Sequence, residues 1–140
     1  QRLQLVEAQP ATIIADRDRI TELILILVDN AIRHTPPEGE ILVSLETAGA
    51  RARLTVRDTG EGIAPEHLPH VFDRFYRAEA SRDRSSGGTG LGLSIAQSIA
   101  HLHGGEIAVT SAPGAGATFT VSFPLIQQHF AQQSFPVSAS

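Results

Sequence analysis

Residues 51–63 read RARLTVRDTGEGI and combine a strand with a candidate site. From Ala52 to Val56, apolar and polar side chains alternate, which is the period-two pattern of a strand with one buried face. Asp58 continues the phase of the apolar residues, so its carboxylate is expected to point to the buried side, where it needs a partner. An amino group on a flat base would satisfy this carboxylate by donating a hydrogen bond to it. The alternative is an aspartate that caps its own turn through the backbone, which is the commoner fate of an Asp-x-Gly sequence.

The turn that follows Asp58 carries two glycines, Gly60 and Gly62, before Ile63. Glycine has no Cβ atom and therefore permits close backbone approach or unusual dihedral angles, as a turn lined by a ligand demands. The turn and Asp58 together form the first candidate site.

Similar alternating segments predict further strands on both sides of this one. They lie at about 2–6, 11–15, 40–47, 105–111 and 117–124. Turn signals such as Ala48-Gly49 and Pro113-Gly114 link most of them as hairpins. Residues 127–140 are rich in Gln and Ser, and they are expected to form a flexible tail after a single domain of residues 1–126.

Three helices are predicted to cover one face of this sheet. The clearest has apolar residues with a period of 3.6, begins after Asp16 as its N-cap and ends near His34, because two prolines follow. Two more helices are expected at about 65–76 and 91–103, the last of them closed by a glycine pair. A mostly antiparallel sheet with three helices on one face is an α/β two-layer sandwich.

A glycine-rich segment, GGTGLGL at residues 87–93, leads directly into the last predicted helix. Free amides at a helix start bind anions, and glycines ahead of the helix let the backbone wrap phosphate oxygens without clashes from Cβ atoms. The sequence contains neither G-x-G-x-x-G nor G-x-x-x-x-G-K-[ST], so it supports neither a dinucleotide fold nor a P-loop. A plain flexible loop is the alternative.

The first helix ends in a polar group made of Asn30, Arg33 and His34, which share one helical face. The amide oxygen of Asn30 is a hard ligand that suits Mg²⁺, a cation that keeps several waters and bridges phosphates. An asparagine tied to a neighbouring backbone group is the ordinary alternative.

A second basic segment, VFDRFYR at residues 71–77, combines apolar anchors with two arginines. Its arginines could meet phosphates, because guanidinium groups suit phosphate geometry. Aromatic residues at such spacing are usually core and arginines usually solvated, so the motif is ambiguous by itself.

The composition excludes several classes of function. The net charge of -4 argues against a nucleic-acid-binding surface, and the absence of cysteine excludes disulfides and thiolate metal sites. The most apolar run, residues 23–28, is far shorter than the ~20 residues of a membrane span. Because the chain has no methionine, it is expected to be a fragment of a longer protein.

In chain order the motifs are DNAIRHTP, DTGEGI, VFDRFYR, GGTGLGLSIAQ, LHGGEI and GAGATF. Each is weak by itself, but together, in this order and spacing, they resemble the catalytic domain of sensor histidine kinases over about residues 3–125. Within the wider gyrase, Hsp90 and MutL ATPase superfamily, the combination of the motifs FDRFYR and GTGLGL resembles that of the histidine kinases. The resemblance implies a Bergerat-type ATP-binding fold, with a mixed sheet, three helices and a mobile lid at about residues 78–88.

The resemblance also implies a site for ATP and Mg²⁺. Asp58 matches the acid that reads the adenine amino group, helped by Thr118 through water, and His34 takes the place of an aromatic that lies against adenine. Asn30 matches the magnesium ligand. The implied nucleotide-binding residues are Asn30, Arg33, His34, Asp58, Gly60, Gly62, Ile63, Tyr76, Arg77, Gly88, Thr89, Gly90, Leu91, Gly92, Leu93 and Thr118, of which Asn30, Arg33 and Arg77 are the catalytic group.

The implied reaction is transfer of the ATP γ-phosphoryl group to a histidine on a separate dimeric helical domain, with positioning and charge neutralisation supplied by this domain. The family's acceptor box is missing from the 140 residues, so the fragment is expected to bind ATP without phosphorylating itself. A response regulator is the implied downstream partner. The fragment is expected to be a monomeric cytoplasmic domain, and the full-length protein a homodimer anchored in the inner membrane.

One position departs from the family pattern, which usually has a polar residue four positions before the magnesium asparagine. Here that position is Ile26, one helical turn from Asn30 on the same side. Isoleucine cannot hydrogen-bond water near a metal, which predicts weaker magnesium binding or turnover. Two alternatives stay open: a degenerate ATP-sensing domain without transfer, and a serine kinase or an ATPase clamp of the same superfamily.

Overall fold

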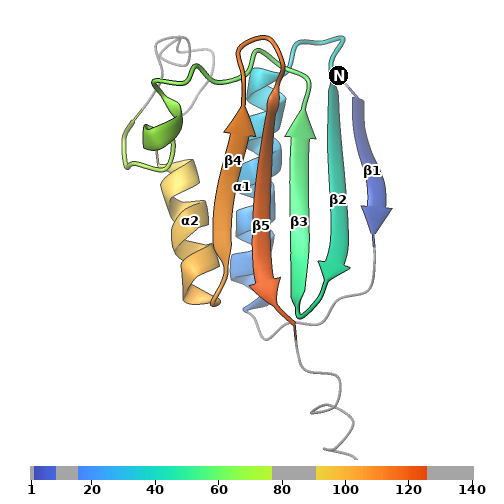
Figure 1. Ribbon diagram of the computed structural model, residues 1–140, viewed down its shortest axis with the longest axis vertical. Helices are drawn as coiled ribbons and strands as arrows, with labels where there is room; N and C mark the ends of the chain where they lie inside the picture. Colours follow the sequence, from blue (N-terminus) through green and yellow to red (C-terminus); the bar gives the residue numbers. More distant parts are fainter. Residues whose placement is uncertain (1, 9–15, 77–90, 126–140) are drawn as a thin grey trace, which may run out of the picture.

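The computed structural model describes residues 2–8, 16–76 and 91–125, in which two α-helices lie on one face of a five-stranded sheet (Figure 1). The sheet order is β1-β2-β3-β5-β4. The strands are β1 (Arg2–Ala8), β2 (Glu40–Ala48), β3 (Arg51–Asp58), β4 (Glu106–Ser111) and β5 (Ala117–Pro124). The helices are α1 (Arg17–His34) and α2 (Gly92–Leu102), with a short 3-10 helix η1 (Leu68–His70) between them in the chain.

The sheet is mixed and mostly antiparallel, as predicted. β1 and β2 are parallel, a pairing that needs a crossover, and α1 supplies it. The other three neighbouring pairs are antiparallel, and β2–β3 and β4–β5 are hairpins. Five of the six predicted strands are confirmed as β1 to β5, whereas the one at 11–15 lies outside the described residues.

α1 forms where the sequence carries both a start signal and an apolar stripe. The Asp16 carboxylate accepts hydrogen bonds from the backbone N–H groups of Asp18 and Arg19, which caps the first turn. The helix ends at His34, and Thr35 is extended because a proline follows it. The first predicted helix is therefore confirmed at both ends, and α2 confirms the last.

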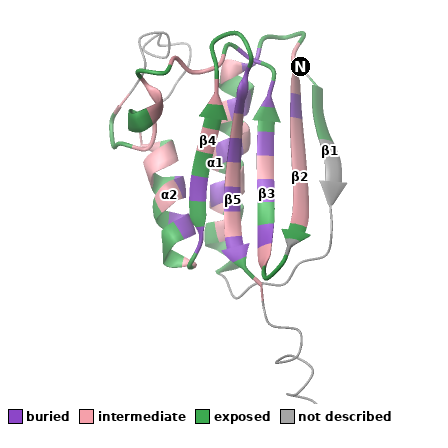
Figure 2. Ribbon diagram, in the orientation of Figure 1, coloured by how far each residue is buried: buried purple, intermediate pink, exposed green. Residues whose placement is uncertain are grey.

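The core lies between the helices and the sheet (Figure 2). Its largest fully buried side chains are Phe119, Leu23, Leu27, Ile41, Val56 and Val121. Burial of one such side chain stabilises the fold by about 1.5–3 kcal/mol, whereas an exposed ion pair such as Arg19–Glu22 contributes about 0–1 kcal/mol. Packing, and not surface charge, therefore fixes the position of α1 on the sheet.

The prediction of a third helix at 65–76 is wrong, because these residues form turns around η1. Their backbone hydrogen bonds join residues three positions apart instead of four. Pro69 has no N–H group and disfavours the α conformation in the residue before it, so a longer helix cannot continue there. Phe72 still packs on the core, edge-to-face with Phe119 at 6.2 Å between ring centroids. The described sandwich therefore has two covering α-helices.

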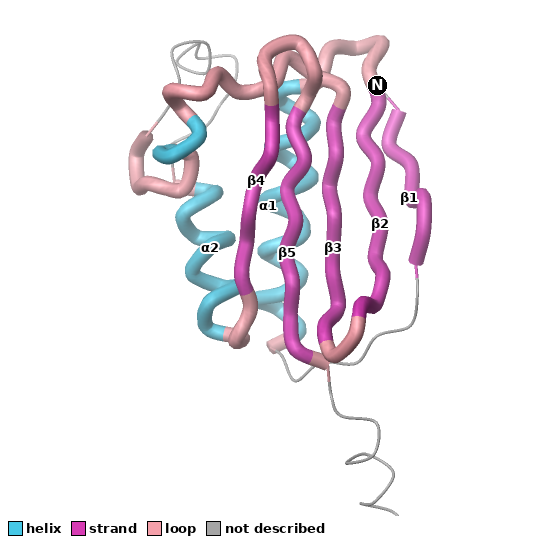
Figure 3. Tube along the Cα trace, in the orientation of Figure 1, coloured by secondary structure: helices cyan, strands magenta, loops and turns pink. Residues whose placement is uncertain are grey.

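Within the part of the chain that the structure describes, no helix lies on the opposite face of the sheet (Figure 3). This face bears the polar half of each alternating strand, including the exposed Arg53 and Arg57 of β3. The same alternation leaves Asp58 on the helix-covered face, where the period-two pattern predicted it. The candidate site therefore lies at the end of β3, between the sheet and α1.

Candidate functional site

Asp58, the last residue of β3, is buried with 3% of its surface exposed. Its Oδ1 atom accepts hydrogen bonds from the backbone N–H groups of Gly60, at 2.9 Å, and Ala117, at 3.2 Å. Within residues 2–8, 16–76 and 91–125, no protein group donates to Oδ2. Asp58 therefore caps its own turn, as the plainer alternative held, and still keeps one buried oxygen open to a donor.

Burial raises the pKa of Asp58 above its ordinary value of 3.8, since surroundings of low dielectric constant disfavour the charged form. The backbone hydrogen bonds from Gly60 and Ala117 and the nearby His34 lower this pKa, while Glu61 raises it. A further donor on Oδ2 would favour the charged form in the same way as the two backbone donors. The site therefore suits a ligand that brings hydrogen-bond donors.

The turn after Asp58 packs tightly, because its glycines lie close to other backbone segments. A Cβ atom on Gly60 would lie 1.9 Å from the carbonyl oxygen of His34, so a larger residue there requires a shift of α1. A Cβ atom on Gly62 would lie 2.0 Å from the carbonyl oxygen of Ala112. The turn is thus held between the end of α1 and the β4–β5 hairpin, which confirms the close approach expected of these glycines.

The C-terminal end of α1 carries two predicted site residues, of which His34 contacts this turn. His34 Nδ1 lies 3.2 Å from Glu61 Oε2. Asn30, one turn earlier, is half-buried, and its side-chain amide has no hydrogen-bond partner in the described part of the chain. An amide oxygen in this condition is a suitable ligand for a Mg²⁺ ion that retains waters and binds phosphates.

Arg33 lies on the more exposed side of α1. Its Nη2 atom pairs with Oδ2 of Asp29 at 3.0 Å, and both side chains are at least one-third exposed. A pair of this kind contributes about 0–1 kcal/mol, so a phosphate group could displace Asp29 from the guanidinium at little cost.

The first turn of α2 lies against α1 at Ile26. A Cβ atom on Gly92 would lie 3.5 Å from Cγ2 of Ile26, which is ordinary contact, and both Ile26 and Leu93 pack on the core. Leu91 is the N-cap of α2 and makes no capping hydrogen bond through its side chain. The N–H groups of this first turn therefore resemble an anion site, next to the side of α1 that bears Asn30.

Tyr76 lies against the turns that precede it. Its hydroxyl group is hydrogen-bonded to Nδ1 of His67, and its ring stacks on His70 with the centroids 5.1 Å apart. Several predicted residues lie outside the described ones, namely Arg77, Gly88, Thr89 and Gly90, together with the predicted lid at 78–88.

The structure does not bring the side chain of Thr118 to Asp58. Alternation along β5 buries Ala117 and Phe119 on the helix side, so Thr118 faces the open side, opposite Arg57 of β3. Ala117 reaches Asp58 instead, through its backbone N–H group. The water-mediated role that was expected of Thr118 does not fit this arrangement.

Two contributors to the site, Ala117 and Ser111, were not predicted from the sequence. A backbone N–H group is the same in every residue except proline, so the residue type of Ala117 carries no signal. Ser111 Oγ accepts a hydrogen bond from the N–H of Ile63 at 2.7 Å and donates one to the carbonyl of Gly116 at 2.7 Å. A serine just before a Pro-Gly turn is a weak signal of such side-chain to backbone bonds.

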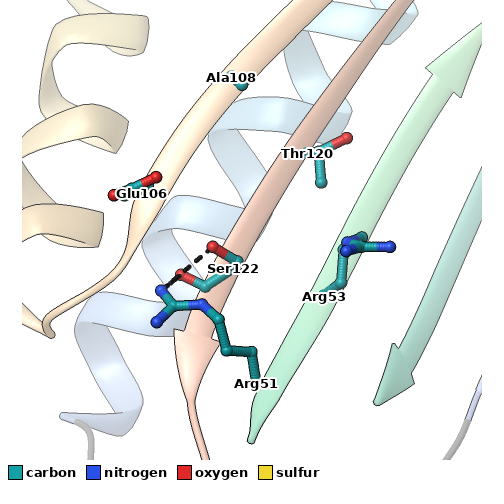
Figure 4. A pocket seen from close by; sticks show the side chains of 6 residues that line it. All are labelled: Arg51, Arg53, Glu106, Ala108, Thr120 and Ser122. Carbon is teal, nitrogen blue, oxygen red and sulfur yellow. Dashed lines mark hydrogen bonds between the residues drawn. The ribbon is translucent and has the colours of Figure 1, made fainter. Parts of the chain in front are cut away.

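A pocket of about 310 Å³ lies on the opposite, open face of the sheet (Figure 4). It is lined by Arg51, Arg53, Glu106, Ala108, Thr120 and Ser122. Arg51 already donates to the carbonyl and hydroxyl oxygens of Ser122, and each lining side chain is exposed or half-buried. This pocket offers nothing comparable to the open oxygen of Asp58, which remains the candidate site.

In the described ranges, no three His, Asp or Glu side chains converge in a way that could hold a metal ion. A cation at the candidate site would therefore take most of its ligands from a nucleotide and from water, as Mg²⁺ commonly does. The described helices also include none that is long and apolar enough to cross a membrane.

A protein-family model for the histidine kinase-, DNA gyrase B-, and HSP90-like ATPases matches residues 15–127. The sensor histidine kinase YkoH of Bacillus subtilis is 49% identical over 125 residues, which make up 88% of this chain and 27% of that protein. The sensor protein SrrB of Staphylococcus aureus is 47% identical over 109 residues, or 78% of this chain and 19% of that protein. The chain thus spans about a quarter or less of the length of these relatives.

Solved structures show the same likeness. The mycobacterial sensor histidine kinase MprB superposes with a TM-score of 0.78 at 30% identity, over 88% of this chain and 84% of that one. Full-length ShkA in complex with AMPPNP gives a TM-score of 0.74 at 28% identity, over 89% of this chain and 26% of that one.

Proposed function

Because the chain belongs to the histidine kinase-, DNA gyrase B- and HSP90-like ATPase family, we propose that it binds Mg-ATP and transfers the γ-phosphoryl group to a histidine on a separate helical domain. The relatives are sensor histidine kinases, and the chain is a catalytic domain of that type. Its ligand and its phosphoryl acceptor are the parts that we infer.

The open Oδ2 atom of Asp58 is the observation that carries the proposal. The N–H groups of Gly60 and Ala117 hold Oδ1, which fixes the direction in which Oδ2 points. The 6-amino group of adenine is a donor that would satisfy this oxygen, and a hydrogen bond to a charged group contributes about 1.5–3 kcal/mol. Guanine has a carbonyl oxygen at the same place, so the site would reject it.

The triphosphate would extend from Asp58 along α1. His34, at the end of α1 beside the Asp58 turn, would lie against the base, and Asn30 is one helical turn, about 6 Å, further along. The first turn of α2, whose N-cap residue Leu91 makes no side-chain cap bond, and the weakly paired Arg33 would meet phosphate oxygens. A bound Mg²⁺, held by Asn30, would neutralise phosphate charge.

Phosphoryl transfer asks little covalent chemistry of the protein, so these residues would act by position and charge. The histidine nitrogen of the acceptor would form a bond to the γ-phosphorus while the bond from that phosphorus to the bridging oxygen breaks, which leaves ADP. The family's acceptor box is not among the 140 residues, so the acceptor would come from a separate dimeric helical domain. A response regulator would then receive the phosphoryl group.

The relatives bear on the remaining parts of the proposal. The solved complex of ShkA contains AMPPNP, an ATP analogue, which supports an adenine nucleotide as the ligand. We further propose that the chain is a monomeric cytoplasmic domain of a dimeric sensor kinase that is anchored in the membrane.

A second candidate function, a sensor that binds ATP without transferring phosphate, is favoured by Ile26. This side chain packs on the core and against the start of α2, where the family usually has a polar group. If Mg²⁺ needs that polar group, nucleotide would bind but phosphoryl transfer would fail.

Calorimetry with ATP and GTP in the presence of Mg²⁺ tests the binding step. ATP is expected to bind and GTP to bind much more weakly, and equal affinities would show that Asp58 does not read the base. Incubation with γ-labelled ATP and a separately supplied helical histidine domain then tests transfer. Label on the supplied domain supports the kinase, whereas ATP binding without label supports the sensor.

A further inference from the structure

One serine hydroxyl joins the two backbone segments that hold Asp58. Ser111 Oγ accepts a hydrogen bond from the N–H of Ile63 at 2.7 Å and donates one to the carbonyl of Gly116 at 2.7 Å. Ile63 belongs to the turn that begins at Asp58, and Gly116 immediately precedes β5. The side chain thus bridges a turn and a hairpin, with 48 positions between Ser111 and Ile63 in the sequence.

Each of the bridged segments supplies a donor to Asp58. The turn supplies the N–H of Gly60 and the hairpin that of Ala117, both to Oδ1. Gly116 also packs on Asp58 directly, since a Cβ atom there would lie 2.0 Å from the Asp58 carbonyl oxygen. A small shift of the hairpin relative to the turn would therefore change the geometry of the carboxylate and its donors.

Apart from the bonds to the Asp58 carboxylate, the other described contacts at this junction are made between backbone groups. The N–H of Gly114 donates to the carbonyl of Glu61 at 2.7 Å, and Gly62 lies against the carbonyl of Ala112. Backbone contacts do not depend on side-chain identity, so they would persist after a substitution at Ser111. A substitution at Ser111 therefore removes the hydroxyl bridge while Asp58 itself is kept.

We propose that Ser111 is a positioning residue for adenine recognition, because its hydroxyl locks the turn to the hairpin and so aims the Asp58 carboxylate at the base. This role rests on the proposed function of the site. Ser111 acts through Asp58 and not on the nucleotide, since its O–H is already donated to Gly116 and its oxygen accepts from Ile63.

The test measures nucleotide affinity by calorimetry, with ATP and with purine riboside triphosphate, which lacks the 6-amino group. Ser111→Ala is expected to bind ATP about tenfold more weakly, at the lower end of the loss for a charge-assisted hydrogen bond. Its affinity for purine riboside triphosphate should change much less, because that nucleotide gains nothing from a well-aimed Asp58. Ser111→Thr retains the hydroxyl and should restore most of the ATP affinity.

Ser122→Ala is the matched control. Ser122 also lies on the β4–β5 hairpin, but its hydroxyl accepts from Arg51 at 3.2 Å on the open face of the sheet (Figure 4). Asp58 lies on the other, helix-covered face. Its removal should leave the affinities for both nucleotides unchanged.

Unchanged ATP affinity in Ser111→Ala overturns the assignment. An equal loss for both nucleotides also overturns it, since that is the result of a general loosening of the pocket. Thermal denaturation identifies a variant that fails to fold, and Ser111→Cys, with a weakly bonding thiol of similar size, then takes its place with the same expected pattern. If the wild-type chain does not bind ATP, or if Asp58→Asn binds it equally well, the proposed function itself fails.

Discussion

Replacement of Asp58 by Asn keeps the shape of the side chain and exchanges one acceptor oxygen for an NH₂ donor. The remaining amide oxygen can still accept from the N–H groups of Gly60 and Ala117, so the turn is expected to keep its form. The exchanged atom is the one at the Oδ2 position, to which no described protein group donates. An adenine amino group would then face a second donor instead of an acceptor.

The expected loss of ATP affinity follows from that one contact. A hydrogen bond to a charged group contributes about 1.5–3 kcal/mol, which corresponds to about 10- to 150-fold in the dissociation constant. Two opposed donors add a repulsion, so the loss for Asp58→Asn should fall at the upper end of this range. The loss of ATP affinity should be smaller for Asp58→Ala, because this substitution leaves a gap in place of the second donor.

The same substitution is expected to stabilise the nucleotide-free domain at neutral pH. Burial raises the pKa of Asp58 above its ordinary value of 3.8, so the folded chain binds this proton more tightly than the unfolded chain. The resulting stabilisation is complete below the ordinary pKa and is lost as the pH rises through the folded-state pKa. The uncharged Asn variant should therefore have the higher free energy of unfolding at pH 7, and the difference should disappear as the pH falls towards 3.8.

Calorimetry with Mg-ATP and chemical denaturation at several pH values measure the two effects. Glu46→Gln is a suitable control, because Glu46 is partly exposed and lies 3.9 Å from Arg53, a pair that contributes about 0–1 kcal/mol. It should not change ATP affinity. An Asp58→Asn variant that binds ATP like the wild type, or that is less stable than it at pH 7, would refute the reasoning.

Three further substitutions test other parts of the structure. Ile26→Asn should tighten Mg-ATP binding, because an amide can hydrogen-bond water near the metal. Equal calorimetric affinities of the variant and the wild type would show that Ile26 does not weaken magnesium binding. Gly60→Ala should destabilise the domain by about 1–3 kcal/mol in chemical denaturation, since the new Cβ atom would lie 1.9 Å from a carbonyl oxygen of α1; unchanged stability would contradict the close packing of the turn. His103→Ala should lower the free energy of unfolding by about 1–3 kcal/mol in chemical denaturation, because two hydrogen bonds of the ring are removed. Its Nε2 accepts from the Asp16 N–H at 3.1 Å, and its Nδ1 donates to the Ile99 carbonyl at 2.8 Å. A smaller loss of stability would mean that these bonds add little.

Local patterns in the sequence were sufficient for most of the secondary structure. The apolar period of α1, its Asp16 cap and the prolines after it lie within one continuous segment, and so do the alternating residues of β3. Elements of this kind form where local preference and core packing agree. The burial of Asp58 followed from the same alternation and could be predicted without any knowledge of its neighbours.

The helix predicted at residues 65–76 does not form. Pro69 removes the N–H group that an α-helix would need there, and the segment forms turns instead. The role expected of Thr118 does not fit because the alternation along β5 turns its side chain to the open face of the sheet, opposite Arg57.

The residues alone were enough to predict the five strands, the two α-helices, the family resemblance and the acid at the centre of the site. How that acid is held depends on tertiary contacts: Ala117 donates to Asp58 across 59 positions of sequence, and Ser111 joins Ile63 to Gly116. One partner in each of these bonds is a backbone N–H or C=O group, which is the same in all residues except for the missing N–H of proline, so the identity of Ala117, Ile63 or Gly116 does not predict the bond. They exist because the sheet and the two hairpins bring distant backbone segments within hydrogen-bond distance.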